Sequence, residues 1–482
     1  MTGAFAGLRA VVAGFGVSGR AAVSVLAEEG ASVLVTESRS FEEIQALAMT
    51  ADEGDAPLTV PPGVTFEGGG HRNEHLDGAD VLVVSPGVPE HAPIVQRALS
   101  GGIPVWSELE IGARLCRAPI VAVTGTNGKT TTVELIASMM RTAGLTARAC
   151  GNVGYPFSLA AHQSHDALAV EASSFQLRFH HSLHPKVSVL LNLAEDHLDW
   201  HGSFEAYADA KARIFALQSP PDVHIGNRDD PRASQVSDTA PCAVRWFRSG
   251  PPHEDDVGVV DDHVIARIES SAAAAMNGRS LEGEIDLGTP RSRAPAFVAD
   301  AAAAAAAALA FGIPADPVRD AIASFTPLPH RGAVVAEVES VRFIDDSKAT
   351  NPHAALAALD GLDRVVLIAG GLAKGVDLRP LAQAAPHLSS VVAIGEAAPA
   401  IAEVFHGLVP VELASSLEEA VEIAFERAPR DGSVVLAPAC ASQDMFRDYR
   451  ERGLRFAAAA ASVAREAVTT GGSMKRRPGH GE

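Results

Sequence analysis

Residues 118–132 have the sequence APIVAVTGTNGKTTT, and this stretch decides the central part of the fold. The run 120–124 predicts a buried strand, the following glycines predict a tight loop, and the apolar spacing of residues 130–141 predicts a helix. Such a loop turns backbone N–H groups and the positive end of a helix dipole toward an anion. Lys129 adds a mobile positive charge, and the Thr130 hydroxyl can hold Mg²⁺. The stretch therefore predicts a nucleotide-phosphate site.

The match to the general phosphate-loop pattern is incomplete. Val123 occupies the place of the first glycine of that pattern. A strand, a turn and a helix with an exposed lysine is the purely structural alternative. The order of strand, Gly-Lys-Thr and helix favours the phosphate site.

Length, charge and cysteine spacing narrow the class of protein. A chain of 482 residues predicts about three domains. The net charge of −20 argues against a nucleic-acid partner. The cysteines lie far apart, so no C-x-x-C redox pair or metal knuckle is predicted. With no membrane span or signal peptide in the pattern, we expect a cytoplasmic, monomeric protein that acts on small molecules.

The N-terminal region carries a second glycine-rich turn. Residues 14–19 read GFGVSG between an apolar strand and a helix, and the next strand, 32–36, ends at Glu37. This arrangement suits a diphosphate at the helix N-terminus and a ribose hydroxyl on the acid. A nucleotide diphosphate other than NAD(P), NAD(P) itself and a structural turn are the alternatives, in that order.

Candidate metal ligands follow the central strands. Glu171 ends the short strand 167–170, which is the usual place for a Mg²⁺ ligand, although an acid that caps a helix is the alternative. His197 and His201 have the spacing of zinc ligands, but no Glu follows His197 as H-E-x-x-H requires. This pattern argues against a zinc hydrolase and leaves one histidine as a possible Mg²⁺ ligand.

Lys211 stands on the apolar stripe of a helix that starts near Ser203. It lies four residues from both Tyr207 and Phe215. An ammonium that faces a core costs several kcal/mol unless it snorkels, is paired or is chemically altered. The pattern leaves these alternatives open.

The last third of the chain repeats a strand, a polar turn and a helix. Strands are predicted at 342–345, 365–369, 391–394 and 434–436. The loops after them that carry lysines or hydroxyls should form one rim, which suits an anionic substrate, with solvated loops as the alternative. Between the central and last thirds, residues 219–293 are predicted to be irregular with a small β extension, and residues 301–308 to form a closely packed alanine helix.

The motifs together resemble the Mur ligase family in their order, over nearly the whole chain. They are residues 124–130, 171–176, 195–197, 211–214, 330–331 and 346–351. The resemblance implies an α/β fold with a Rossmann-like N-terminal domain, a P-loop-type central ATPase domain and a Rossmann-like C-terminal domain. The corresponding boundaries are 1–115, 116–326 and 327–468, followed by a disordered tail at 469–482.

The resemblance also implies an activity. Ser442 after Pro438, together with Ser347-Lys-Ala-Thr-Asn351, looks most like the members that add D-glutamate to UDP-N-acetylmuramoyl-L-alanine in peptidoglycan precursor synthesis. These ligases work through an acyl phosphate, with ATP, two Mg²⁺ ions and a carbamylated lysine, here Lys211. A family member that adds another amino acid, an NAD-dependent dehydrogenase and a non-catalytic nucleotide-binding protein are the alternatives.

Site residues are implied by the same resemblance. For the UDP group they are Gly14, Phe15, Gly16, Val17, Ser18, Glu37, Ser38, Arg39, Ser85, Pro86 and Gly87, and for the muramoyl-alanine portion Asn152, Ser173 and Gln176. For ATP they are Gly125, Thr126, Asn127, Gly128, Lys129, Thr130, Thr131, Arg331 and Asp346. For D-glutamate they are Lys348, Thr350, Lys374, Ser442 and Tyr449. The implied metal ligands are Thr130, Glu171, His197 and Lys211, and the implied catalytic residues are Lys129, His197, Lys211, Arg331 and Lys348.

The chain departs from the family pattern in two places. Where family members usually carry His-Asn and a second Asn at the start of the helix after the β extension, this chain has Ala296, Phe297 and Asp300. Tyr449 stands where the D-glutamate-adding members often have Phe. The first departure bears on ATP contacts and the second is a milder change.

Overall fold

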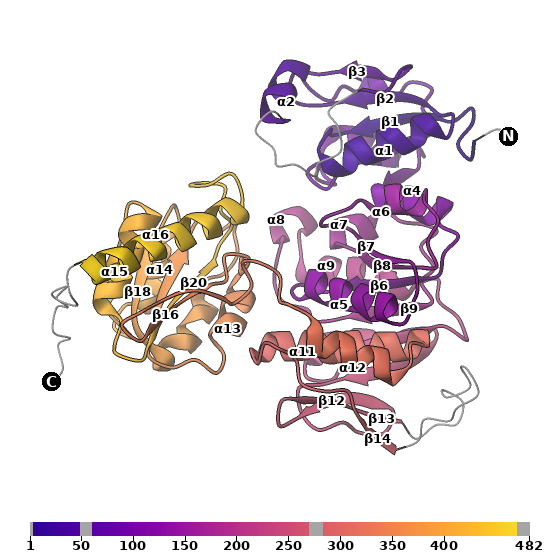
Figure 1. Ribbon diagram of the computed structural model, residues 1–482. Helices are drawn as coiled ribbons and strands as arrows, with labels where there is room; N and C mark the ends of the chain where they lie inside the picture. The colour runs from indigo at the N-terminus through magenta and orange to yellow at the C-terminus, as the bar shows by residue number, and fades with distance from the viewer. Residues whose placement is uncertain (1–2, 49–59, 269–282, 470–482) are drawn as a thin grey trace. The chain divides into compact units, whose positions relative to one another are not determined.

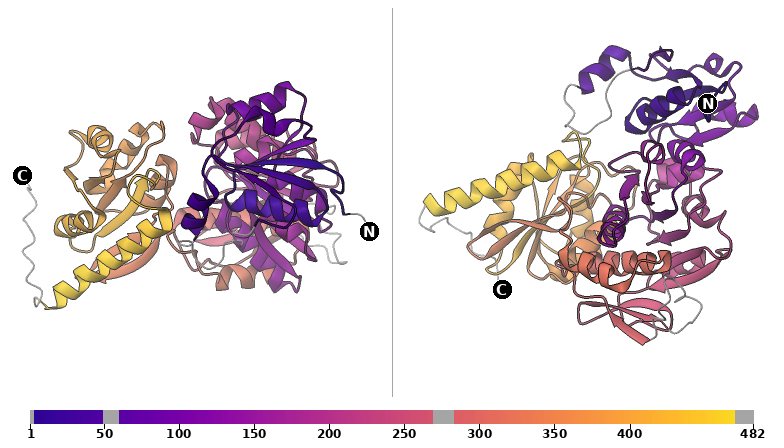
Figure 2. Two further views of the ribbon diagram at one scale, coloured as in Figure 1. Left: turned by 90° about the horizontal axis from the view of Figure 1, so that it is seen from above. Right: turned by 45° about the vertical axis from the view of Figure 1, so that its right-hand side comes forward.

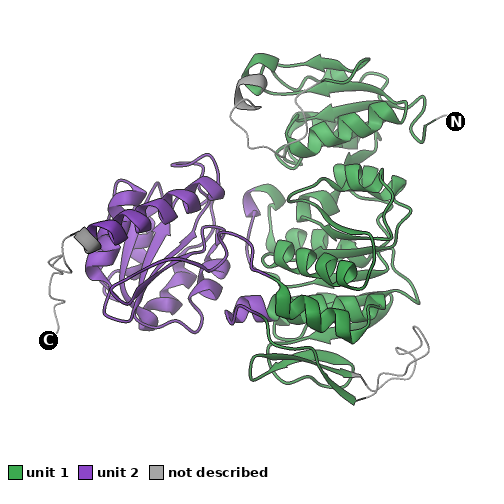
Figure 3. Ribbon diagram, viewed as in Figure 1, with its two compact units in different colours: residues 1–193, 200–290, 299–325 green, residues 194–199, 291–298, 326–482 purple. Residues whose placement is uncertain are grey.

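The computed structural model describes residues 3–48, 60–268 and 283–469 (Figure 1). The chain forms two compact units (Figure 3). Unit 1 contains residues 1–193, 200–290 and 299–325, and unit 2 contains residues 194–199, 291–298 and 326–482. The tail predicted at 469–482 falls, from residue 470 on, outside the described residues.

The N-terminal sheet of unit 1 is parallel, with the strand order β3-β2-β1-β4-β5. Its strands are β1 (Arg9–Ala13), β2 (Ser32–Thr36), β3 (Thr65–Glu67), β4 (Val81–Val84) and β5 (Val105–Ser107). The elements between and after them are α1 (Val17–Glu28), α2 (Phe41–Ala48), η1 (Asn73–Leu76), α3 (Pro93–Ser100) and α4 (Glu108–Leu115). Val12 and Val83 enter one core while Val11 and Leu82 enter another, so both faces are buried, as a parallel sheet requires.

The central sheet of unit 1 has the order β14-β13-β12-β11-β10-β9-β6-β8-β7. Its strands are β6 (Ile120–Thr124), β7 (Ala147–Gly151), β8 (Ala167–Glu171), β9 (Val187–Leu190), β10 (Val223–Asn227), β11 (Ala243–Phe247), β12 (Asp256–Val260), β13 (His263–Ile268) and β14 (Gly283–Asp286). Its helices begin with α5 (Lys129–Thr142), α6 (Phe157–Ala161), α7 (Ser174–Arg178), α8 (Leu198–His201), α9 (Phe204–Ala212), η2 (Arg213–Phe215) and α10 (Pro231–Ser237). The antiparallel pairs β12–β13 and β13–β14 form the predicted β extension.

The prediction of irregular structure over 219–293 was wrong for β10, α10 and β11, which continue the parallel sheet. His224 explains the error, because it interrupts the apolar pattern of β10 although it is fully buried. Its ring nitrogens lie 2.7 Å from Ser188 Oγ and 3.0 Å from Ser237 Oγ. A polar core residue satisfied by distant partners cannot be recognised from local periodicity.

The alanine-rich segment forms α11 (Pro295–Phe311), which is followed by α12 (Ala315–Ser324). Residues Ala301 to Ala308 are each at most 5% exposed, so this helix is buried on every side rather than along one stripe. Small side chains allow that close approach. Within the described ranges, no helix combines the length and apolar character needed to cross a membrane.

Unit 2 is built on a sheet with the order β15-β16-β20-β17-β18-β19. Its strands are β15 (Ala333–Val338), β16 (Val341–Asp345), β17 (Val365–Gly370), β18 (Leu388–Ile394), β19 (Val411–Leu413) and β20 (Ser433–Ala439). Its helices are α13 (Pro352–Leu359), η3 (Arg379–His387), α14 (Ala398–Phe405), α15 (Leu417–Arg427) and α16 (Tyr449–Thr469), the long yellow helix of Figure 2. The strands predicted at 342–345, 365–369, 391–394 and 434–436 are confirmed as parts of β16, β17, β18 and β20.

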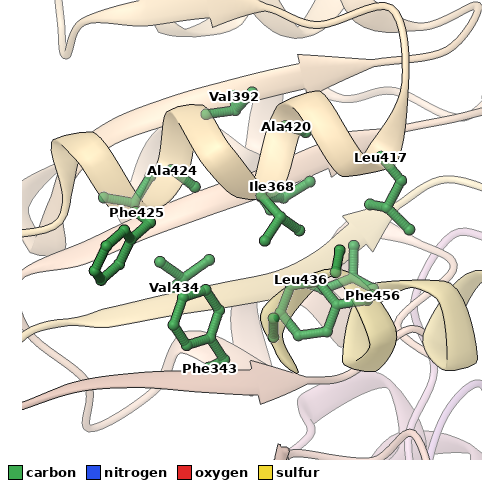
Figure 4. Close-up of a cluster of buried hydrophobic side chains, with 14 of the residues drawn as sticks. Phe343, Ile368, Val392, Leu417, Ala420, Ala424, Phe425, Val434, Leu436 and Phe456 are labelled. Atoms are coloured by element: carbon green, nitrogen blue, oxygen red, sulfur yellow. The ribbon is translucent and has the colours of Figure 1, made fainter. Parts of the chain in front are cut away.

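Alternate residues of the unit 2 strands serve two cores. Val434 and Leu436 pack with Phe425 of α15 and Phe456 of α16 (Figure 4). Val435, between them, faces the core on the side of α13 and α14. Burial on both faces fixes the strand register, because a shift by one residue would exchange the two faces.

Enlarging one buried alanine of α11 tests the close packing of this helix. We expect Ala303→Leu to destabilise unit 1 by about 1–3 kcal/mol, because the fully buried site must move to admit three more carbons. Denaturant unfolding followed by circular dichroism measures the change. Ala323→Leu on the exposed face of α12 is the control and should change stability far less. Equal effects of the two substitutions would contradict the packing argument.

Candidate functional site

The phosphate loop connects β6 to α5. Gly128 has φ +84° and Gly125 has φ +155°, values that side chains rarely adopt. The Nζ of Lys129 donates to Gly125 O at 2.8 Å and to Thr126 O at 2.7 Å, so the lysine folds back over the loop. Residues 125–131 therefore form a turn that continues into the start of α5, and the ammonium of Lys129 lies over the backbone of that turn.

Asp300 of α11 lies against this loop. A Cβ at Gly128 would lie 2.2 Å from Asp300 Oδ1, so the carboxylate occupies the space that the glycine leaves. The departure from the family pattern at residue 300 thus places an acid beside the phosphate loop.

Two side chains that the sequence analysis did not select hold the loop in place. Asn192 Oδ1 accepts from Asn127 N at 2.8 Å, and Asn192 O accepts from Thr126 N at 3.0 Å. The Tyr207 hydroxyl lies 3.0 Å from Thr126 Oγ1. Residues 186–193 have the sequence KVSVLLNL, an apolar pattern that predicts a strand running through Asn192. In the structure β9 ends at Leu190, which leaves Asn192 in a loop at the strand's carboxyl end. A shorter strand prediction would have revealed it.

Glu171 lies at the end of β8, beside the strand that leads into the phosphate loop. It is in register with Val123 of β6, and its side chain is 2% exposed. Its Oε1 accepts from Asn152 Nδ2 at 3.0 Å, while its Oε2 is buried without a hydrogen-bond partner in the described chain. A buried carboxylate oxygen of this kind fits a Mg²⁺ ligand better than a helix cap.

Lys211 is buried rather than snorkelling. The side chain is 2% exposed, its Nζ donates to Gly125 O at 2.7 Å, and the Nζ lies 4.6 Å from the centroid of the Tyr207 ring. The carbonyl of Gly125 thus accepts from both Lys129 and Lys211. Among the described residues, no group of three or more histidine, cysteine, aspartate and glutamate side chains gathers as a metal cluster.

A small cavity in unit 1 brings predicted residues from distant segments together. It is lined by Ser85, Pro86, Ser107, Phe175, Gln176 and Trp200, among others. Gln176 contributes mainly to structure here, because its Oε1 accepts from Ser173 N and Ser173 Oγ, both at 3.0 Å, within a capping box at the start of α7. Its amide nitrogen is 3.5 Å from Glu108 Oε2.

The N-terminal glycine turn is tied to the end of β2 by Glu37. Glu37 Oε2 accepts from Phe15 N at 2.7 Å, and Oε1 accepts from Ser38 N at 3.0 Å and Ser38 Oγ at 2.9 Å. Burial opposes ionisation, but the hydrogen bonds from Phe15, Arg39 and Ser38 outweigh it and lower the pKa of Glu37 to about 2. The acid thus holds residues 14–18 against residues 37–39. Ser85 Oγ donates to Gly14 O at 2.9 Å and adds the turn at 85–87 to this group.

The loops at the carboxyl ends of the unit 2 strands gather several predicted residues. Lys348 Nζ lies 4.0 Å from the centroid of the Tyr449 ring, and Ser442 is buried in the loop after β20. Thr350 is partly buried in the loop after β16, while Lys374, with φ +52°, is exposed in the loop after β17. His330, which was not among the predicted site residues, has its Nδ1 2.7 Å from Asp345 Oδ2.

Other predicted residues also belong to unit 2. His197 has φ +53°, and its neighbour Asp196 accepts from Asn351 Nδ2 at 3.2 Å. Burial raises the pKa of Asp346 to about 7, and Asp345 adds to the rise while Arg331 opposes it. Unit 2 thus brings the predicted Arg331 and Asp346 close enough to interact.

Family models match the chain in three stretches. They are the Mur ligase MurD-like N-terminal domain over residues 8–107, the Mur ligase middle domain over 123–268, and the Mur ligase glutamate ligase domain over 330–440. A UDP-N-acetylmuramoylalanine–D-glutamate ligase of Frankia casuarinae is 41% identical over 464 residues, covering 94% of each chain. A protein of the same name from Streptomyces avermitilis is 39% identical and covers 94% of this chain and 98% of its own.

Solved structures show the same fold at low identity. The UDP-N-acetylmuramate–alanine ligase MurC from Thermotoga maritima is 17% identical with a TM-score of 0.56, covering 95% of this chain and 100% of its own. The MurF ligase from Thermotoga maritima in complex with ADP is 16% identical with a TM-score of 0.56, covering 95% and 97%. The predicted three-part α/β fold is confirmed.

The raised pKa of Asp346 predicts a pH dependence of stability. With its folded pKa near 7 and its ordinary value at 3.8, the folded state binds more protons across that window, so stability falls as pH rises from about 4 to 7. Asp346→Asn should remove this component, measured by denaturant unfolding of the nucleotide-free protein at a series of pH values. The exposed Asp360→Asn variant should keep the wild-type profile. Parallel profiles for wild type and Asp346→Asn would refute the assignment.

Proposed function

This chain belongs to the Mur ligase family, and on that premise we propose that it adds D-glutamate to UDP-N-acetylmuramoyl-L-alanine with ATP, through an acyl phosphate. The name shared by the relatives that are about 40% identical supports the choice of substrates. The structural observation that supports the chemistry is the gathering of Lys129, Lys211 and Glu171 around one phosphate loop.

Amide formation needs an activated carboxylate, because a free carboxylate is a poor acyl donor. The alanyl carboxylate attacks the γ-phosphorus of ATP, which breaks the bond to the bridging oxygen and releases ADP. The amine of D-glutamate then attacks the acyl carbon, loses a proton, and the tetrahedral intermediate expels phosphate. Lys129, already held over the loop, offsets the charge that develops on the transferred phosphoryl group.

Mg²⁺ supplies Lewis-acid stabilisation of the phosphate charge when it is bound. Thr130, Glu171 and a carbamylated Lys211 are the ligands that we propose from unit 1. Glu171 Oε2, which has no hydrogen-bond partner among the residues that the structure describes, fits this role. Carbamylation joins the neutral lysine amine to the carbon of CO₂ and releases one proton, which replaces a buried cation by an anion. His197 is proposed as a further ligand from its place in the sequence alone.

The remaining assignments follow the three regions of the chain. We propose residues 1–115 as the UDP-binding domain, 116–326 as the ATPase domain and 327–468 as the amino-acid domain. In the last, Lys348, Thr350, Lys374, Ser442 and Tyr449 would hold D-glutamate, while Arg331 and Asp346 would contact ATP. The packing of Lys348 on Tyr449 supports a shared subsite for these two residues.

An assay of the purified protein tests the proposed reaction. We expect ADP release from ATP that requires both UDP-N-acetylmuramoyl-L-alanine and D-glutamate, measured by a coupled spectrophotometric assay. Replacing D-glutamate with L-alanine, L-lysine or diaminopimelate should abolish the release. Activity with one of those amino acids instead would identify a different ligase of the family. Tight ATP binding with no turnover in any mixture would indicate a non-catalytic nucleotide-binding protein. Binding of NADH, without any role for Lys129, would indicate a dehydrogenase.

Removing the buried lysine tests the metal-site role of Lys211. Lys211→Ala should lower turnover by about 100-fold or more, because the loop loses a ligand or a charge, and a short carboxylic acid such as acetate should restore part of the rate by supplying the missing anion. Lys186→Ala is the control and should retain activity, because it removes a lysine whose Nζ donates a hydrogen bond to Phe311 O and not to the phosphate loop. Wild-type turnover in Lys211→Ala would exclude the role.

A further inference from the structure

Arg452 of α16 is a fully buried cation that no part of the proposed chemistry uses. Its side chain is 0% exposed. Its Nε donates to Ser347 Oγ at 3.0 Å, its Nη2 to Ser347 O at 2.8 Å, and its Nη1 to Cys440 O at 3.1 Å. These acceptors are neutral. Burial lowers the pKa of Arg452 to about 10, and the nearby Cys440, Asp444 and Asp345 act against that shift. Burying a guanidinium without a carboxylate hydrogen-bonded to it costs stability, which points to a role other than stabilising the fold.

The guanidinium lies where loops from different strands meet. Ser347 belongs to the loop after β16, and Cys440 to the loop after β20. The loop after β17 joins them, because Leu372 and Ala441 exchange backbone hydrogen bonds of 2.9 and 3.0 Å. Gly371 of that loop, with φ +124°, packs so closely that a Cβ would lie 3.3 Å from Arg452 Nη1. The guanidinium thus donates hydrogen bonds to two of the loops that carry proposed D-glutamate residues and lies beside the third.

The contacts continue from Ser347 to the proposed subsite itself. Ser347 Oγ also donates to Tyr449 O at 2.7 Å, which fixes the start of α16. The Tyr449 ring in turn packs on the Nζ of Lys348, the residue next to Ser347. On the other side, Cys440 lies two residues before Ser442. Arg452 therefore sits behind Lys348, Tyr449 and Ser442 without reaching the surface.

We propose that Arg452 is a positioning residue that fixes the geometry of the amino-acid subsite, an inference that rests on the proposed function. The guanidinium presents donors in a rigid planar fork, so it can set the distance between two loops. A lysine would keep the charge but lose the fork. The buried guanidinium would thereby fix the spacing between Lys348 and Ser442, which are both proposed to hold D-glutamate.

Kinetics of Arg452→Lys test this role. We expect the KM for D-glutamate to rise by about tenfold or more, since small misplacements of binding groups are costly, while the KM values for ATP and UDP-N-acetylmuramoyl-L-alanine change less than about twofold. Ser347→Ala, a milder change that removes only the shared hydroxyl, should give the same pattern in weaker form. Arg455→Lys is the matched control, because Arg455 is on the same helix but pairs with Glu418 at the surface.

Hydrogen–deuterium exchange of the protein without substrates tests the positioning independently of the reaction. Residues 346–351 and 439–442 should exchange faster in Arg452→Lys than in wild type or Arg455→Lys. Unchanged exchange in these loops, an unchanged KM for D-glutamate, or an equal rise of all three KM values would each overturn the proposal. A wild-type protein that does not use D-glutamate would refute the proposed function instead, and the exchange result would still decide whether Arg452 fixes the loops.

Discussion

The phosphate loop depends on two ammonium groups that donate hydrogen bonds to the same backbone carbonyl. Lys129 and Lys211 come from elements 82 positions apart in the chain, yet both donate to Gly125 O. Like charges brought together in a buried place raise each other's energy unless an anion joins them. Negative charge that can balance these groups comes from Asp300 beside Gly128, from Glu171 at the end of β8 or from a bound phosphate, and a carbamate on Lys211 would remove one of the two cations. Asn192 and Tyr207 hold the backbone that makes this meeting possible.

Two buried carboxylates of α4 form hydrogen bonds that connect the N-terminal part of unit 1 to its central part. Glu108 of α4 accepts from Ser158 N at 2.6 Å, and burial raises its pKa. Glu110 of the same helix accepts from His181 N at 2.7 Å and Ser182 N at 2.8 Å. These hydrogen bonds from backbone N–H groups attach α4 to the central part of unit 1. Ser107, the residue before Glu108, lines the cavity that contains Ser85 and Gln176.

Unit 2 also holds a buried ionisable side chain by hydrogen bonds to loops, but there the side chain is positively charged. There the buried charge is the guanidinium of Arg452, and its acceptors are carbonyls and a hydroxyl. In each case an ionisable side chain inside the protein forms hydrogen bonds with backbone groups of a loop. Loops that lack secondary structure of their own gain a defined position in this way, and positions of loops decide where ligands can bind in α/β proteins.

The local sequence pattern was sufficient to predict the strands, loops and helices that carry the candidate site residues. It was insufficient to predict the hydrogen bonds that join these elements. The sequence alone predicted the strand, loop and helix at residues 120–142, the acid at the end of β8 and the apolar stripe that carries Lys211. These depend on periodicity and on turn residues, which neighbouring positions reveal. Only the tertiary structure decided that Glu37 and Gln176 bond within the protein, that His224 is a core residue and that Arg452 joins three loops. The partner of a buried polar group is chosen by packing between segments distant in the chain, and no local pattern records that choice.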